Sequence, residues 1–352
     1  MTRAAVCLDG VSWEYIEEAR TPFLDWVARH GTATECLAMV PTVTNVNNTS
    51  IITSSYPEEH GITSNWYYDM SLGREVYMDS SRYLRVKTSL QVEAERGHRT
   101  LLLTVKDKLR RLLAEGVTHS YSLEQPDPMA VSALGEAPDI YNQESSRWII
   151  EAATREAEEG GYHLIYASTT DYVPHKHPPG DQVTREYVSD IDEALERLHG
   201  ATEEIVVTAD HGMNAKTVNI DPVGILRDRG IEARMVASIR DEHVAHHGNM
   251  GGSAYIYTEE AEEAVEALSS VEGIEEVNTR REAAGMYRLD AERIGDLLLG
   301  DEVHTFGPNP RGHYRDVDIR SHGSLHERAV PLLSTHRCEV DGLYNKDALS
   351  LL

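Results

Sequence analysis

The chain has few cysteines, few lysines and no long apolar run, and each shortage excludes a class of protein. Its three cysteines, Cys7, Cys36 and Cys338, are far apart in 352 residues and form no CxxC pair. Neither a disulfide framework nor a zinc ribbon is indicated, so buried free thiols are expected. No apolar stretch approaches membrane-spanning length and no leader-like segment opens the sequence, so we expect a cytoplasmic protein in a reducing setting.

Positive charge is scarce as well. The 33 lysines and arginines, only six of them lysine, stand against 59 acidic residues, which gives a formal net charge of -26. A field of this sign repels polyanions, so neither a nucleic acid polymer nor an anionic membrane is an expected partner. A small anionic substrate would need a local positive site. The sequence leaves a homodimer open.

Apolar segments of strand length alternate with amphipathic helical segments along the first two thirds of the chain. Strand patterns occupy 3–8, 100–105, 163–168 and 204–209, and helical patterns occupy 21–31, 106–116 and 184–200. This alternation predicts an α/β fold, with a mostly parallel central sheet that carries helices on both faces.

No internal repeat or flexible linker divides the chain cleanly. After Gly252 a strand, helix, strand pattern appears, and a Gly/Pro/His-rich stretch follows at 304–313. We interpret this part as a small α+β cap inserted into the core. The predicted organisation is a core at 1–240, a cap at 241–312 and a return to the core at 313–352. An ordinary continuation of the main sheet is the alternative.

Chemically active residues follow each predicted strand. In chain order they are Asp9, then Lys106 and Lys108, then Asp171, then Asp210 and His211. Ligand sites of open parallel sheets lie beyond the carboxyl ends of the strands, so we expect these residues to converge. Taken singly, an aspartate after a strand is more commonly a turn former or a helix cap.

Histidines accompany two of these aspartates and add metal-ligand character. In "DYVPHKH", Pro174 disfavours a helix interior, so Asp171 and His175 are expected to reach one cation from a loop or a first helical turn. His322, in "RSHG", lies in another turn-like setting. This distribution predicts two cations, which together clamp the attacking and leaving atoms of a displacement at phosphorus.

The stretch "PTVTNVNNTSIITS" at 41–54 concentrates hydroxyl and amide groups ahead of an apolar segment. We interpret Thr44 as a nucleophile in a polar turn, before a helix that begins near Asn47 and directs N–H groups at an anion. A plain capping cluster is the simpler alternative. Lys106 and Lys108 open a helix, where the macrodipole disfavours cations, so they indicate a bound anion, and a solvated helix start is the alternative.

The segments "CLDG", "PTVTNVNNTSIITSSYPEEHGI", "TTDYVPHKH", "TADHGM" and "RSHG" together resemble the alkaline phosphatase superfamily. They are most similar to its branch of nucleotide pyrophosphatase/phosphodiesterases and phosphonoacetate hydrolase. Within that branch "TNVNN", "HGITSNWYYD", "TVKDKL", "TTDYVPHKHPPG" and "ADHGMNAK" resemble phosphonoacetate hydrolase most. Val46 stands where this resemblance leads us to expect proline.

The resemblance implies roles for individual residues. One zinc ion would be held by Asp171, His175 and His322, and a second by Asp9, Asp210, His211 and the Thr44 oxygen, with manganese or iron as alternatives. Thr44 would be the nucleophile, Asn65 a donor to a phosphonate oxygen, and Lys106 and Lys108 the ligands of a substrate carboxylate. His246 and His247 stay open between substrate contact and packing, and His60 and His177 are expected to be structural or exposed.

The expected function is hydrolysis of the C–P bond of phosphonoacetate to acetate and phosphate. A phosphodiesterase or nucleotide pyrophosphatase with the same metals is the main alternative, in which Tyr67 and Tyr68 contribute to a slot for a base. A phosphotransferase or mutase would pass the phosphoryl group to an acceptor other than water. The alternative outside catalysis is a metal-dependent binding or scaffold protein whose site is catalytically inactive.

Overall fold

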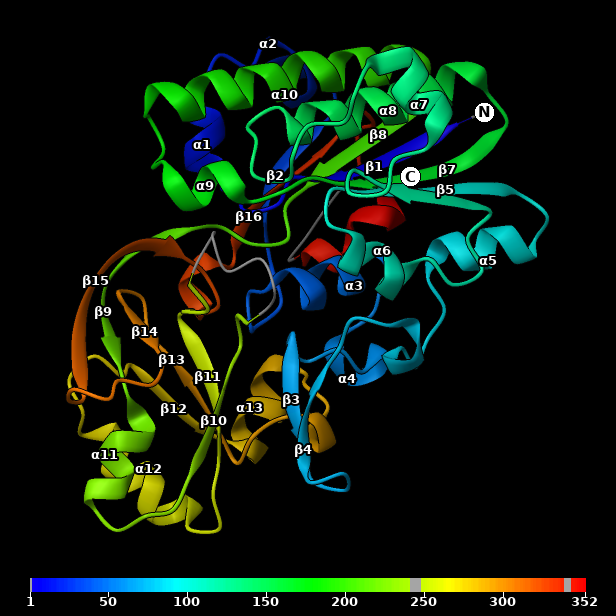
Figure 1. The fold of residues 1–352 in the computed structure, drawn as a ribbon. Helices are drawn as coiled ribbons and strands as arrows, with labels where there is room; N and C mark the ends of the chain where they lie inside the picture. The colour runs from blue at the N-terminus through cyan, green and yellow to red at the C-terminus, as the bar shows by residue number, and fades with distance from the viewer. Residues whose placement is uncertain (1, 241–247, 339–342) are drawn as a thin grey trace.

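The computed structural model of the protein describes residues 2–240, 248–338 and 343–352, and a seven-stranded sheet forms its centre (Figure 1). The five strands from β8 to β6 are mutually parallel, whereas β16 runs antiparallel to both β8 and β2. The predicted α/β fold with a mostly parallel sheet is confirmed. In spatial order the strands are β2 (Thr32–Leu37), β16 (Ala329–Ser334), β8 (Glu204–Thr208), β1 (Arg3–Cys7), β7 (Tyr162–Ser168), β5 (Arg99–Thr104) and β6 (His119–Ser122).

Both faces of this sheet are buried under helices. Successive side chains of a strand point to opposite faces, so Ala4 and Val6 pack in one apolar cluster while Ala5 and Cys7 pack in another. Figure 1 shows the two layers of helices that cover these faces. The first layer contains α1 (Trp13–Glu17), α2 (Pro22–His30), α7 (Pro128–Leu134), α8 (Ser145–Glu159), α9 (Tyr172–Lys176) and α10 (Gln182–Ala201). The second contains α3 (Thr44–Thr53), α5 (Ser89–Glu95) and α6 (Asp107–Leu113), and α4 (Pro57–His60) follows α3.

Two smaller sheets and a hairpin form the other part of the molecule (Figure 1). The antiparallel four-stranded sheet has the order β10 (Arg234–Ala237), β11 (Ser253–Tyr257), β13 (Leu297–Gly300) and β12 (Glu276–Thr279). Its two faces carry α11 (Pro222–Asp228) with α12 (Ala261–Ser269), and α13 (Arg280–Tyr287). The three-stranded sheet has the order β14 (His304–Phe306), β9 (Asn214–Ile220) and β15 (Tyr314–Ser321), and the hairpin pairs β3 (Trp66–Asp69) with β4 (Arg74–Tyr77).

The strands of the two smaller sheets come from all three predicted segments, 1–240, 241–312 and 313–352. That division of the chain stays a prediction. Cys7 and Cys36 are buried free thiols, as expected, whereas Cys338 is only partly buried. Within the described ranges, every helix is too short or too polar to cross a lipid bilayer.

Candidate active site

The carboxyl ends of the parallel strands form one edge of the central sheet, and the predicted aspartates gather there. Asp9 follows β1, Asp171 follows β7 and Asp210 follows β8. Because Cys7 of β1 is in register with both Ser168 and Thr208, the three aspartates leave the sheet at nearly the same level. All three are buried.

Three histidines join these aspartates from different elements. His211 follows Asp210, His175 belongs to α9, and His322 follows β15. Ligand atoms lie within 4.8 Å of one another in two groups, Asp171 with His211 and His322, and Asp9 with Asp210 and His211. His175 Nε2 lies 3.0 Å from Asp171 Oδ2. All six predicted carboxylate and imidazole residues therefore meet at this edge.

The orientation of the three imidazoles is fixed by the backbone. The Nδ1 of each ring lies within hydrogen-bond distance of a main-chain carbonyl, and a carbonyl can only accept, so Nδ1 carries the proton and the Nε2 lone pair is available to a cation. Such backbone partners are typical of metal-ligating histidines. The pairs are His175 with Arg320 at 2.6 Å, His211 with Gly212 at 3.0 Å and His322 with Thr42 at 2.6 Å.

The carboxylates at this edge are buried close together, an arrangement that a bound cation would stabilise. Neither oxygen of buried Asp9 accepts a hydrogen bond from the described residues. Burial raises the pKa of Asp9 well above its usual range, and Asp171 and Asp210 raise it further. Burial and the neighbouring Asp171 raise the pKa of Asp210 to about 7. Divalent ions would relieve this crowding of buried negative charge, and the donor set suits them.

Lys106, predicted from the helix-start argument, faces the same aspartates. Its Nζ lies 2.7 Å from Asp171 Oδ1 and 3.7 Å from Asp9 Oδ2. Burial opposes ionisation of Asp171, but Lys106 and then His175 outweigh it and hold the pKa of Asp171 well below its usual range. Lys108 is also buried, in the first turn of α6.

Thr44 lies beside the cluster at the start of α3. Its Oγ1 is 3.4 Å from His211 Nε2. The helix begins at Thr44 and not near Asn47 as predicted, because Val43 is extended and its carbonyl already accepts the Asn47 N–H. The side chain of Thr44 is consequently held on a rigid element.

Asn48 is a site residue that sequence reasoning missed. Its Nδ2 donates to Asp210 Oδ2 at 3.0 Å, and its Oδ1 accepts from the Tyr166 hydroxyl at 2.8 Å. It therefore joins the helix of Thr44 to a predicted metal ligand. The spacing of four residues from Thr44 places both on one helix face and is the signal that would have found it.

Asn65 is tied to the beginning of α3 through Met78. The Met78 N–H donates to the Asn65 carbonyl at 2.8 Å, and Asn45 Nδ2 donates to the Met78 carbonyl at 3.0 Å. The side-chain oxygen of Asn65 is buried and accepts no hydrogen bond from the described residues. Val46, where proline was expected, packs in the core beneath α3.

The remaining predicted residues have other surroundings. Tyr67 donates its hydroxyl to Asp69, and the Tyr68 ring packs edge-on against Tyr257 with centroids 5.6 Å apart. His60 is buried, and His177 is half-buried with Nδ1 2.8 Å from an oxygen of Asp181. His246 and His247 lie outside the described residues.

Known proteins resemble this chain in sequence and in fold. The family model for type I phosphodiesterase / nucleotide pyrophosphatase matches residues 4–323. The crystal structure of phosphonoacetate hydrolase from Sinorhizobium meliloti 1021 in complex with phosphonoacetate has a TM-score of 0.91 at 32% identity, covering 98% of this chain and 93% of that one. Murine ectonucleotide pyrophosphatase / phosphodiesterase 5 shares the fold, with a TM-score of 0.70 at 18% identity, covering 100% of this chain and 94% of that one.

Curated relatives are more distant. Ectonucleotide pyrophosphatase/phosphodiesterase family member 7 of Mus musculus is 22% identical over 243 residues, which cover 61% of this chain and 50% of that protein. The chain spans about half the length of this relative and of its rat counterpart. The family model covers most of the chain, and the resemblance to the alkaline phosphatase superfamily is confirmed. The chain belongs to the type I phosphodiesterase / nucleotide pyrophosphatase family.

Proposed function

We propose that the protein is a metal-dependent hydrolase that cleaves the C–P bond of phosphonoacetate with Thr44 as its nucleophile. The observation that carries the proposal is the meeting of the Thr44 hydroxyl with a buried set of three aspartates and three histidines. Lys106 beside that set, and the 32% identity to phosphonoacetate hydrolase over 98% of the chain, support the choice of substrate.

The carboxylate and imidazole residues would hold two divalent cations. Asp171, His175 and His322 would bind one, and Asp9, Asp210, His211 and the Thr44 oxygen would bind the other. Zinc is the first choice for these nitrogen and oxygen donors, and manganese or iron would suit much the same set. Such cations, when bound, lower the pKa of a hydroxyl and neutralise charge on phosphoryl oxygens.

The chain's own residues account for the rest of the reaction. The Thr44 hydroxyl loses its proton and its Oγ forms a bond to phosphorus as the C–P bond breaks, and the electron pair of the C–P bond passes to the methylene carbon. That negative charge spreads into the adjacent carboxylate, which Lys106 and Lys108 would bind, while Asn65 would donate to a phosphoryl oxygen. The carbon takes a proton to give acetate, and water then cleaves the phosphate ester of Thr44.

A phosphodiesterase or nucleotide pyrophosphatase is the second candidate, and the family model favours it. It would use the same Thr44 chemistry, with an alcohol or a nucleotide phosphate as the leaving group. Such a leaving group presents no carboxylate beside the scissile bond. The two lysines therefore separate the candidates.

The first test is a substrate screen of the zinc-loaded protein against phosphonoacetate, other phosphonates, a nitrophenyl phosphodiester and a dinucleotide. We expect fastest turnover of phosphonoacetate, with free phosphate released and no acceptor present, which argues against a phosphotransferase. Rapid cleavage of the diester with phosphonoacetate untouched would establish the second candidate instead. If neither phosphonates nor diesters are hydrolysed, the hypothesis of a binding or scaffold protein is favoured.

The second test is Lys108→Ala, because Lys106 also pairs with Asp171 and its loss would disturb a metal ligand. For phosphonoacetate we expect kcat/KM to fall by about 10²–10³-fold, the usual cost of one lost charge-stabilising contact. For the diester we expect little change. Lys176→Ala, at an exposed lysine, is the matched control.

A further inference from the structure

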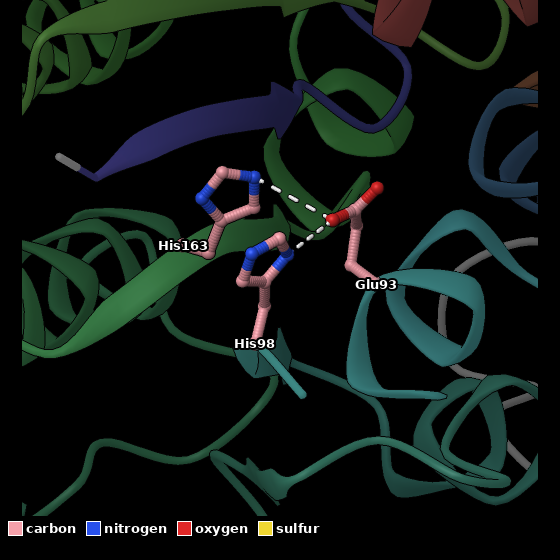
Figure 2. A group of neighbouring side chains, drawn as sticks. All are labelled: Glu93, His98 and His163. Atoms are coloured by element: carbon pink, nitrogen blue, oxygen red, sulfur yellow. Dashed lines mark hydrogen bonds and ion pairs between the residues drawn. The ribbon is translucent and has the colours of Figure 1, made fainter. Parts of the chain in front are cut away.

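A second group of histidines and a carboxylate lies at the opposite edge of the central sheet, where the parallel strands begin. Glu93 belongs to α5, His98 lies immediately before β5, and His163 is the second residue of β7. One ligand atom from each lies within 4.8 Å of the others. Figure 2 shows both imidazole rings directed at the Glu93 carboxylate. We call these three residues the amino-edge cluster.

The contacts of this cluster converge on one carboxylate oxygen (Figure 2). Glu93 Oε2 lies 2.6 Å from His98 Nδ1 and 3.5 Å from His163 Nε2. The two rings stack, with centroids 4.1 Å apart and planes 29° apart. Two imidazole nitrogens and a carboxylate oxygen are zinc ligands, and ligand atoms around tetrahedral zinc lie about 3.4 Å apart. A small opening of the Glu93–His98 contact would therefore admit an ion.

The neighbouring arginines leave suitable lone pairs in place. Arg96 bonds the other Glu93 oxygen, Oε1, at 2.6 Å. An Arg3 guanidinium nitrogen lies 2.8 Å from His163 Nε2, and since a guanidinium only donates, this nitrogen carries the lone pair. Arg3 also donates to the Leu352 carbonyl, so it has a second partner if it leaves His163.

We propose that Glu93, His98 and His163 form a binding site for one divalent transition-metal ion of the zinc class, in competition with Arg3. The His98 side chain is 45% exposed, so the ion can enter from solvent and keep water as a further ligand. A bound ion would join α5 to the beginning of β7. The site shares no residue with the candidate active site and stands independently of the proposed function.

The test compares zinc stoichiometry in the full chain by equilibrium dialysis and metal analysis. The variants are His98→Gln/His163→Gln and, as a control at an exposed histidine elsewhere, His336→Gln. We expect the double variant to bind one equivalent less zinc than the wild type and the control to bind the same amount. Turnover of whichever substrate the wild type accepts should stay unchanged in both. Equal zinc binding by the double variant and the wild type would overturn the proposal.

Two further variants keep the test decisive. If the double variant does not fold, Glu93→Gln changes one ligand to a near-isosteric amide and should weaken binding of this equivalent by at least about tenfold. Arg3→Gln removes a competing cation and should tighten it by about fivefold or more, the effect of one unit charge some 4 Å away in a solvated setting. Weaker zinc binding by Arg3→Gln would contradict the proposed competition.

Discussion

The two edges of the central sheet both gather histidines and carboxylates, but they hold them differently. At the carboxyl edge the histidine Nδ1 atoms bond main-chain carbonyls, as His322 does with Thr42, and the side chains are buried. In the amino-edge cluster the imidazole nitrogens bond the side chains of Glu93 and Arg3, and His98 is 45% exposed. Backbone partners cannot move away, whereas side-chain partners can. The carboxyl edge is thus preorganised, and the amino edge is adjustable.

The largest expected effect concerns the preorganised edge. Thr44→Ala should lower the rate of hydrolysis by at least about 10³-fold, as loss of a nucleophile does elsewhere, because Thr44 alone among the described residues places a hydroxyl within hydrogen-bond distance of His211. Bound metal and thermal stability should stay close to those of the wild type. The measurement is product release together with metal analysis.

Thr53→Ala, at the other end of the same helix, is the control and should keep full activity. Thr44→Ser should restore part of the rate because it restores the hydroxyl. Undiminished hydrolysis by Thr44→Ala would end the assignment of the nucleophile and would leave the metal cluster to act on water directly.

The difference between the edges also explains what the sequence could predict. Asp9, Asp171 and Asp210 each follow an apolar strand, so a local pattern together with the geometry of parallel sheets was enough to predict where they meet. Their roles, and those of Thr44 and the lysines, stay predictions. Asn48 was missed although its spacing of four residues from Thr44 was visible in the sequence. The amino-edge cluster was missed because its contacts join residues from separate elements, which no short motif records.

The next largest expected effect is on stability, and it concerns the buried ion pair that supports the turn of His322. Lys216 Nζ lies 2.9 Å from Glu327 Oε1, both side chains are fully buried, and the other Glu327 oxygen accepts from Ser324 two residues beyond His322. Lys216→Met would leave a buried carboxylate without its cation and should lower the free energy of unfolding by about 3–5 kcal/mol. Denaturant unfolding measures this.

The matched control for that change is a solvent-screened ion pair. Arg197 pairs with Glu151 at 2.8 Å while 43% of its side chain is exposed, so Arg197→Met should cost about 1 kcal/mol or less. Equal losses for Lys216→Met and Arg197→Met would contradict the view that a buried, fixed framework supports the carboxyl edge.

A third prediction concerns pH and His60, which lies behind α3. The Ile62 N–H donates to His60 Nδ1 at 3.1 Å, so His60 Nε2 carries the proton and donates to Ser50 Oγ at 2.9 Å. Burial, and then Arg293, lower the pKa of His60 from 6.5 to about 3. Between these two pH values, His60 is protonated in the unfolded chain and neutral in the folded chain. Stability from this residue is complete above pH 6.5 and is lost as pH falls, by about 2 kcal/mol at pH 5.

The measurement is the free energy of unfolding at pH 7.5 and pH 5 for the wild type and for His60→Gln, which cannot titrate. Taking the difference between the two proteins removes the contribution of the other acidic and histidine residues. The wild type should lose about 2 kcal/mol more than the variant on acidification. The same loss in both proteins would show that His60 already takes up its proton when folded.

The smallest expected effect of a substitution, in the absence of metal, belongs to the adjustable edge. With a chelator present, His98→Gln should change the free energy of unfolding by about 1 kcal/mol or less, because solvent screens the contact that the 45% exposed His98 side chain makes with Glu93. With zinc in large excess the wild type should become more stable than the variant, by about 2.7 kcal/mol at a hundred times the dissociation constant. A large loss of stability for His98→Gln in the presence of chelator would mean that the amino edge is as fixed as the carboxyl edge. The absence of any zinc-dependent difference would leave the cluster as a surface ion pair, so the two conditions together measure how adjustable this edge is.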